Sequence, residues 1–326
     1  MPKCDLVLEG GGVKGIGLVG AAQALEAAGY TFENLAGTSA GAIVAALLAA
    51  GYSGQEIEEE LVRLDYRNFK QAEPLDHLGV PGKFMSMIFH FGLYKADFFE
   101  HWLVGLLARK GKTVFGDIRA AEGNGSKSKW RMQAVASDIT DRTMLVLPRD
   151  LSRFGLDPDG FPIARAVRMS MSIPLFYEPC LLTDSTGVDH LIVDGGLLSN
   201  YPLWLLDGEA RADRPVFGCK FSRSKGECAQ TGIRQGHPIA FAEALVSTAL
   251  DAHDNHHIST TKGDLDRSIL IPTDVAADGK TARVSTTDFG ISKAVSMALL
   301  ENGRHAAETF LAQWNFSHWK TRFLGL

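Results

Sequence analysis

A serine framed by two glycines carries the residue types that ester chemistry uses. Gly37-Thr-Ser-Ala-Gly41 is a G-x-S-x-G pentapeptide between an apolar stretch and a predicted helix. In a nucleophile elbow the serine occupies a sharp strand-to-helix turn, and the glycines admit neighbouring backbone. The following helix directs N–H groups and its positive dipole end toward the serine. Ser39 is therefore a candidate nucleophile, although a serine here can also be an ordinary helix N-cap.

A serine nucleophile needs a base that accepts its proton, and Asp194 is the candidate. It follows the apolar run 191–193 and precedes Gly195 and Gly196. In an α/β sheet, ligands bind at the carboxyl ends of strands, where a partly desolvated carboxylate can have a raised pKa. The alternative is that Asp194 only begins a turn, as Asp-Gly pairs often do.

Histidine is the most frequent base in such chemistry, but the sequence places none in a context that marks it as one. The histidines that follow Asp194 in the chain are His237, His253, His256, His257, His305 and His318. The i,i+4 spacing of His253 and His257 would suit a metal ion on one helix face, but H-E-x-x-H is absent. The four cysteines form no C-x-x-C pair. We therefore predict no metal site and no cofactor.

A glycine-rich stretch, 10–15, connects a predicted strand with a predicted helix. Such a turn presents backbone N–H groups at a helix N-terminus, where negative charge binds. Its glycines also fit the dinucleotide-binding pattern G-x-G-x-x-G, which predicts a pyrophosphate ligand. That Rossmann interpretation requires an acid at the end of the second strand. Glu33 instead precedes "NLAGTS", and no P-loop G-K-[ST] occurs.

The elements around these motifs alternate between strand and helix. The sequence predicts strands over 5–9, 32–39 and 267–272, a hairpin over 130–148, and helices over 16–28, 40–50, 55–64, 239–254 and 293–312. This order predicts an α/β fold with a mostly parallel central sheet flanked by helices. The α/β-hydrolase fold has several strands before its elbow. Because Ser39 follows only two strands, we do not expect that fold.

Composition places the chain among globular proteins. It has 326 residues, 45% of them hydrophobic and 22% charged, with a net charge of -5. This acidic balance offers no basic face for nucleic acid, so no nucleic-acid partner is expected. The longest apolar run, 40–51, is too short to span a bilayer, and no signal peptide is recognisable. We expect a single domain over 1–326 in the cytoplasm.

In chain order, three motifs resemble those of the patatin-like phospholipases: "GGGVKG", "GTSAG" and "DGG". They agree in type, order and context, and the similarity covers about residues 5–202. "VASDITD", "VRMSMSIPLFYEP" and "DGGLLSNYP" are weaker marks of the same family, while residues 203–326 are less informative. The chain departs from the family in D-G-G for D-G-A, and in Met169 and Met171 where small residues are common. These departures concern substrate shape more than chemistry.

The resemblance implies a Ser–Asp dyad without histidine, with Ser39 as nucleophile and Asp194 as base. It also implies that the glycine loop supplies an oxyanion hole, through N–H groups of the stretch Gly10, Gly11, Gly12, Val13, Lys14 and Gly15. Lys14 stands at the family's Arg/Lys position, where it either supports the site or is simply solvated. The implied substrate is an acyl ester of a glycerolipid or phospholipid, cleaved as by a phospholipase A through an acyl-enzyme.

Two alternatives stay open within this family. Some bacterial patatin-like proteins are effectors that an upstream signal switches on, so an enzyme silent without its activator remains an alternative. The aromatic segment 81–112 and the tail residues Trp314, Phe316, Trp319 and Phe323 leave a peripheral membrane contact open. We favour a core role for the segment, and a docked element or a dimer contact for the tail. The sequence carries no other signal for an oligomeric state.

Overall fold

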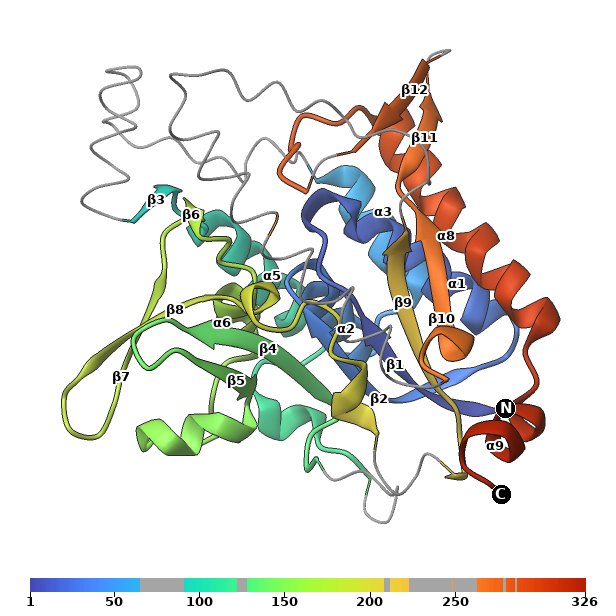
Figure 1. The fold of residues 1–326 in the computed structure, drawn as a ribbon. Helices are drawn as coiled ribbons and strands as arrows, with labels where there is room; N and C mark the ends of the chain where they lie inside the picture. The colour runs from blue at the N-terminus through green and yellow to red at the C-terminus, as the bar shows by residue number, and fades with distance from the viewer. Residues whose placement is uncertain are drawn as a thin grey trace.

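A central β-sheet organises the computed structural model, which describes residues 1–64, 91–121, 128–207, 212–222, 248, 263–277, 280–284 and 286–326. Eight described strands form it in the order β10-β9-β1-β2-β4-β8-β7, with β5 also paired to β4 (Figure 1). The fold is α/β with a mostly parallel central sheet flanked by helices, as the sequence predicts.

The parallel part of the sheet contains the two strands that lead into the glycine loop and the elbow, β1 and β2. It consists of β1 (Lys3–Leu8), β2 (Thr31–Thr38), β4 (Met132–Asp138), β9 (Val216–Ser222) and β10 (Ser268–Pro272). All five residues of β1 after Lys3 are buried, as expected for a parallel strand covered on both faces. Because β1 pairs with β2 on one side and β9 on the other, the glycine-rich turn that follows β1 begins in the middle of the sheet.

The other part of the sheet is antiparallel. It contains β5 (Thr143–Leu147), β7 (Cys180–Thr183) and β8 (Asp189–Asp194). β8 pairs antiparallel with both β4 and β7. Two small sheets lie apart: β3 (Gly92–Tyr94) with β6 (Leu175–Tyr177), and β11 (Asp274–Ala277) with β12 (Lys280–Arg283).

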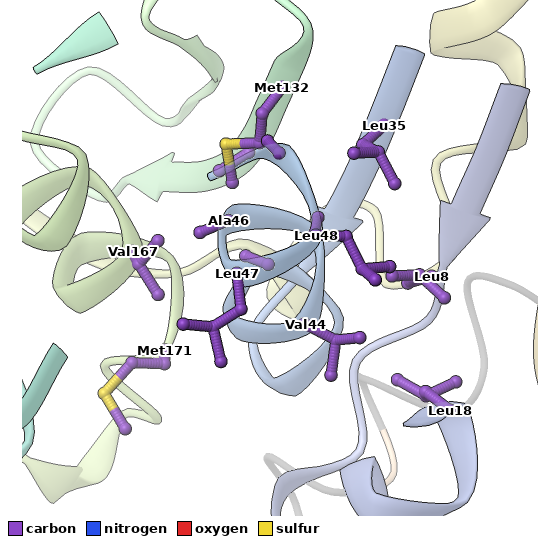
Figure 2. Close-up of a cluster of buried hydrophobic side chains, with 14 of the residues drawn as sticks. Leu8, Leu18, Leu35, Val44, Ala46, Leu47, Leu48, Met132, Val167 and Met171 are labelled. Carbon is purple, nitrogen blue, oxygen red and sulfur yellow. The ribbon is translucent and has the colours of Figure 1, made fainter. Parts of the chain in front are cut away.

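The helix that follows Ser39, α2 (Ala40–Ala49), is buried on almost every side. Figure 2 shows its side chains surrounded by Leu8 and Leu35 from β1 and β2, Val167 from α6 (Ile163–Ser170), and Leu18 from α1 (Ile16–Ala27). A helix that is apolar all round belongs in a core. Its N-terminus, and with it the elbow, is therefore fixed by packing.

Three further helices complete the surroundings of the site. α3 (Gly54–Arg63) begins with a capping box and buries one face, and α5 (Asp97–Arg109) buries Phe99, Leu103, Leu106 and Leu107. α8 (Lys293–Gln313) packs along α1 and the edge strand β10 (Figure 1). The α1–α8 contact depends on glycine, because a Cβ on Gly303 would lie 1.8 Å from the Gly17 carbonyl oxygen.

The aromatic tail is docked against the protein, as we expected for it. In α9 (Phe316–Phe323), Trp319 is buried and its indole N–H donates to the Gly263 carbonyl at 3.1 Å. The Arg267 guanidinium lies over the same ring, 5.7 Å from its centroid. In the described part of the aromatic segment, 91–112, α5 buries four apolar side chains, which supports the expected core role, while Phe91 and Val104 are exposed. Residues 81–90, the helix expected over 239–254 apart from residue 248, and His253 and His257 lie outside the described residues.

Candidate active site

Ser39 occupies a strained turn between β2 and α2. Its φ is 53° and its ψ is -121°, a backbone conformation that residues other than glycine rarely adopt. Gly37 and Gly41 permit the turn, because a Cβ on Gly37 would lie 2.4 Å from the Gly41 carbonyl carbon. A Cβ on Gly41 would lie 2.1 Å from the Leu8 carbonyl oxygen. The two elbow glycines therefore serve the close backbone approach for which the pattern is known.

Asp194 reaches Ser39 through the register of the sheet. Val135 of β4 pairs with Thr38, and the next residue, Ala136, pairs with Asp194. β4 thus places Asp194, at the end of β8, level with Ser39, the residue that follows β2. Asp194 is the last residue of β8, as the expected strand end requires, and β8 runs antiparallel to β4.

The Asp194 carboxyl is almost completely buried and hydrogen-bonded to Ser39. It is 2% exposed, accepts the Gly196 N–H at 2.7 Å, and is bonded by the Ser39 side chain. Burial raises its pKa from 3.8 to about 7, while the bonds from Gly196 and Ser39 act in the opposite direction. A carboxyl with this pKa can both hold and release a proton near neutral pH.

The glycine loop lies beside Ser39, and two of its backbone N–H groups have no backbone acceptor within the described residues. A Cβ on Gly10 would lie 3.2 Å from the Ser39 Cβ, and Gly12 lines the same cavity as Ser39. Three of the loop amides already donate to backbone carbonyls, those of Gly10, Val13 and Lys14. Within the described part of the chain, the N–H groups of Gly11 and Gly12 have no such acceptor. These two amides are the ones available to an anion.

Two distant segments fix the shape of this loop. The Asn200 carbonyl accepts the Gly10 N–H at 3.0 Å, and the Asn200 side chain donates to the Gly10 carbonyl at 3.2 Å. The Thr286 carbonyl accepts the Val13 N–H at 3.2 Å. Gly12 has a φ of +55°, and a Cβ there would lie 2.0 Å from the Thr286 oxygen. Only glycine fits this position without moving the backbone.

Lys14 is half-buried at the start of the first helical turn. Its ammonium lies 5.3 Å from the centroid of the Phe221 ring, within the range of a cation–π contact. The side chain is therefore ordered against β9, which differs from the simple solvation that one interpretation of the sequence predicted.

An apolar cavity opens at Ser39. It is partly open to solvent, and apart from Ser39 its lining residues are glycine, aliphatic and aromatic. Ile43 and Val44 of α2, Trp102 of α5, and Phe289 contribute to the wall. This apolar lining suits an aliphatic chain.

No histidine in the described ranges hydrogen-bonds to Ser39. His305 and His318 lie on α8 and α9, and the other candidates lie outside those ranges. His190 is buried, but its Nδ1 is 2.8 Å from the Asp138 carboxylate. Asp138, Asp141 and His190 bring ligand-type atoms within 4.8 Å of one another. The second Asp138 oxygen accepts two backbone N–H groups, so this group secures the β4–β5 turn.

Comparison with known proteins gives the family of this chain. The sequence model of the patatin-like phospholipase family matches residues 6–207, which include both Ser39 and Asp194. The chain belongs to the patatin-like phospholipase family. Membership supports the hydrolysis of lipid esters as the reaction class. Among the described helices, none combines the length and the apolar character that crossing a bilayer requires.

Individual relatives extend the similarity beyond the matched region. The uncharacterized protein YqhO of Bacillus subtilis is 41% identical over 316 residues, which cover 96% of this chain and 99% of YqhO. The uncharacterized protein R571 of Acanthamoeba polyphaga mimivirus is 26% identical over 278 residues, 82% of each chain. The crystal structure of VipD from Legionella pneumophila shares the fold, with a TM-score of 0.53 and 18% identity. That similarity covers 95% of this chain and 66% of VipD.

Several residues of this patatin-like site were not singled out from the sequence. Ser170 and Ser172 contact the backbones of Ser39 and Asp194, and their motif, "RMSMSIP", was noted only as a family mark. Thr286 and Phe289 have no sequence signal at all. Their contacts with the glycine loop and the cavity form only when the distant C-terminal region packs.

Proposed function

We propose that this protein is a lipid acyl hydrolase of phospholipase A type that uses Ser39 and Asp194 as a catalytic dyad. The observation that carries the proposal is the hydrogen bond between a strained serine and a buried carboxyl whose pKa burial raises to about 7. Ser39 lies in the wall of an apolar cavity whose lining suits an acyl chain of a glycerolipid or phospholipid.

In the proposed reaction, the carboxylate of Asp194 takes the proton of the Ser39 hydroxyl as Ser39 attacks the ester carbonyl. The N–H groups of Gly11 and Gly12 stabilise the oxyanion, a contribution of about 10²–10³ in rate per donor. Asp194 returns the proton to the leaving alcohol, which departs as a lysolipid or glycerol. Water then gives a proton to Asp194 and attacks the acyl-enzyme. As the bond between the acyl carbon and the Ser39 oxygen breaks, Asp194 passes this proton to that oxygen, which releases the fatty acid and restores Ser39.

A fluorophosphonate probe tests the nucleophile directly, because it forms a covalent bond with an activated serine. We expect the full-length protein to be labelled at Ser39, as identified by peptide mass, and Ser39→Ala to remain unlabelled. Ser185→Ala, which removes an exposed turn serine, serves as the matched control and retains the label.

Unlabelled protein from the same preparation should also hydrolyse p-nitrophenyl acyl esters and phospholipid vesicles. Absence of labelling at Ser39 in the folded wild-type protein would contradict a competent dyad. It would instead favour the gated enzyme that is silent without its activator.

A further inference from the structure

Ser170, the last residue of α6, joins the nucleophile to the middle of the sheet. Its hydroxyl oxygen accepts the backbone N–H of Ser39 at 3.0 Å. The same hydroxyl donates to the Val135 carbonyl of β4 at 2.6 Å. Ser170 has no exposed surface. Water therefore cannot replace either bond when the side chain is removed.

The backbone of Ser39 needs such a partner. Its φ of 53° is a strained conformation, and a strained residue keeps its geometry only where its surroundings determine it. The N–H of Ser39 is buried at the start of α2, and Ser170 supplies its hydrogen-bond acceptor. Without this bond, rotation of the Ser39 peptide would relieve strain and turn the hydroxyl away from Asp194.

The same short segment holds the acid. The Ser172 carbonyl accepts the Asp194 N–H at 2.8 Å. The Ser172 side chain is itself bonded to Arg168, whose guanidinium also donates to the Glu178 carbonyl at 3.0 Å. Residues 170–172 therefore contact both partners of the dyad, one through a side chain and one through the main chain.

We infer that Ser170 is a positioning residue, which holds the strained Ser39 backbone so that the hydroxyl faces Asp194. This inference rests on the proposed dyad. It assigns a role to a side chain that touches neither the substrate nor the reacting atoms. Loss of its hydroxyl should slow the chemical step without weakening substrate binding, because the apolar cavity stays intact.

Ser170→Ala tests the inference, with Ser137→Ala as the matched control. Ser137 is also fully buried and lies on β4, but within the described residues its hydroxyl has no hydrogen-bond partner. We expect Ser170→Ala to lower kcat by about 10- to 100-fold, the range that a small misplacement of a reacting group produces. KM should stay within about twofold, and fluorophosphonate labelling per folded molecule should slow in parallel with kcat.

Two further readouts separate positioning from a general loss of structure. The midpoint of the pH–rate profile should rise, because a Ser39 hydroxyl turned away from Asp194 no longer lowers the pKa of that carboxyl. Ser170→Thr, which keeps the hydroxyl, should recover more activity than Ser170→Cys, whose thiol is a weak hydrogen-bonding group. Should Ser170→Ala fail to fold, Ser170→Cys fills nearly the same space and provides the comparison with Ser137→Ala.

The inference would be overturned if Ser170→Ala, or a folded Ser170→Cys, were as active as the control Ser137→Ala. A loss confined to KM would also overturn it. Failure of the dyad itself gives a different result, because the wild-type protein would then carry no label at Ser39.

Discussion

Ser39 has an unfavourable backbone conformation, and Asp194 has a carboxyl whose charged form is unfavourable. A non-glycine residue in a sparsely populated region of φ/ψ space costs about 1–3 kcal/mol. At Asp194, burial disfavours the charged form of the carboxyl and so raises its pKa. Both costs fall on the two residues that form the proposed dyad, which is where stored strain is expected to serve function.

Asp194→Asn should lower kcat/KM by about 10²–10⁴, the usual contribution of a positioned base. The amide can still accept the Gly196 N–H, so the geometry should survive while the proton acceptor is lost. Esterase assays of this variant check the prediction, with Asp157→Asn, a carboxylate that caps a surface turn, as control. Near-normal turnover in Asp194→Asn would mean that another group, such as a histidine outside the described residues, is the base.

The pH dependence of the reaction follows from the raised pKa of Asp194. Because the ionised carboxylate is the base, kcat/KM should be half-maximal at about pH 7 and fall about tenfold per pH unit below it. A profile measured with a p-nitrophenyl ester, corrected for folded fraction at each pH, tests this expectation. A midpoint near the ordinary carboxyl value of 3.8 would show that burial does not control this group.

The same shift makes a prediction about stability. A carboxyl whose pKa is higher in the folded state stabilises the fold while it is protonated. That stability is lost as the pH rises from about 3.8, the ordinary value, to about 7. Asp194→Asn should therefore lose this decline and unfold at a higher temperature than the wild type above pH 7. Thermal unfolding followed by circular dichroism at several pH values compares the two proteins, and an equal decline in both would contradict the assignment.

At the scale of helices and strands, the sequence predicts the features that depend on residues close together in the chain. Glycines mark the ends of α1 and α2, and apolar runs define β1 and β4, so the elbow and the glycine loop were placed correctly. The antiparallel direction of β8 was not predicted, because strand pairing depends on contacts between residues far apart in the chain. The role of Asn200 in holding Gly10 could not be predicted for the same reason.

The glycine loop provides a matched pair of substitutions. Gly12 and Gly111 have similar φ values, +55° and +64°, but a Cβ would meet Thr286 at the first and open space at the second. Gly111→Ala should cost about 1–2 kcal/mol of stability from backbone strain alone and leave turnover intact. Gly12→Ala should also displace the loop amides and lower kcat by about 10²–10³. Equal kcat in the two variants, from steady-state assays, would exclude the loop from oxyanion stabilisation.

On the scale of the whole molecule, the site is larger than the region that the family model matches. That region ends at residue 207, yet the carbonyl of Thr286 holds the glycine loop and Phe289 forms part of the cavity wall. α8, which follows them, packs against α1 directly behind the loop. The similarity to YqhO covers 96% of this chain and so includes this C-terminal region. We infer that residues 286–326 form one functional unit with the motifs, in keeping with the single domain that we expected.

Phe289 offers a test of this unit because it joins the C-terminal region to the acyl cavity. Its ring is buried, stacks on Phe176 with centroids 5.2 Å apart, and lies edge-on to Tyr177. Phe289→Ala should lower kcat/KM for long-chain p-nitrophenyl esters by about tenfold, since a long acyl chain loses contact with this wall. The acetyl ester, which is too short to reach the wall, should change much less. Phe316→Ala, which removes a partly buried ring of the docked tail, should leave the ratio of long- to short-chain activity unchanged.

Phe289→Leu, which keeps the position apolar, gives the same comparison with less loss of packing. An unchanged ratio in both Phe289 variants would show that the acyl chain binds entirely within the region of the three motifs.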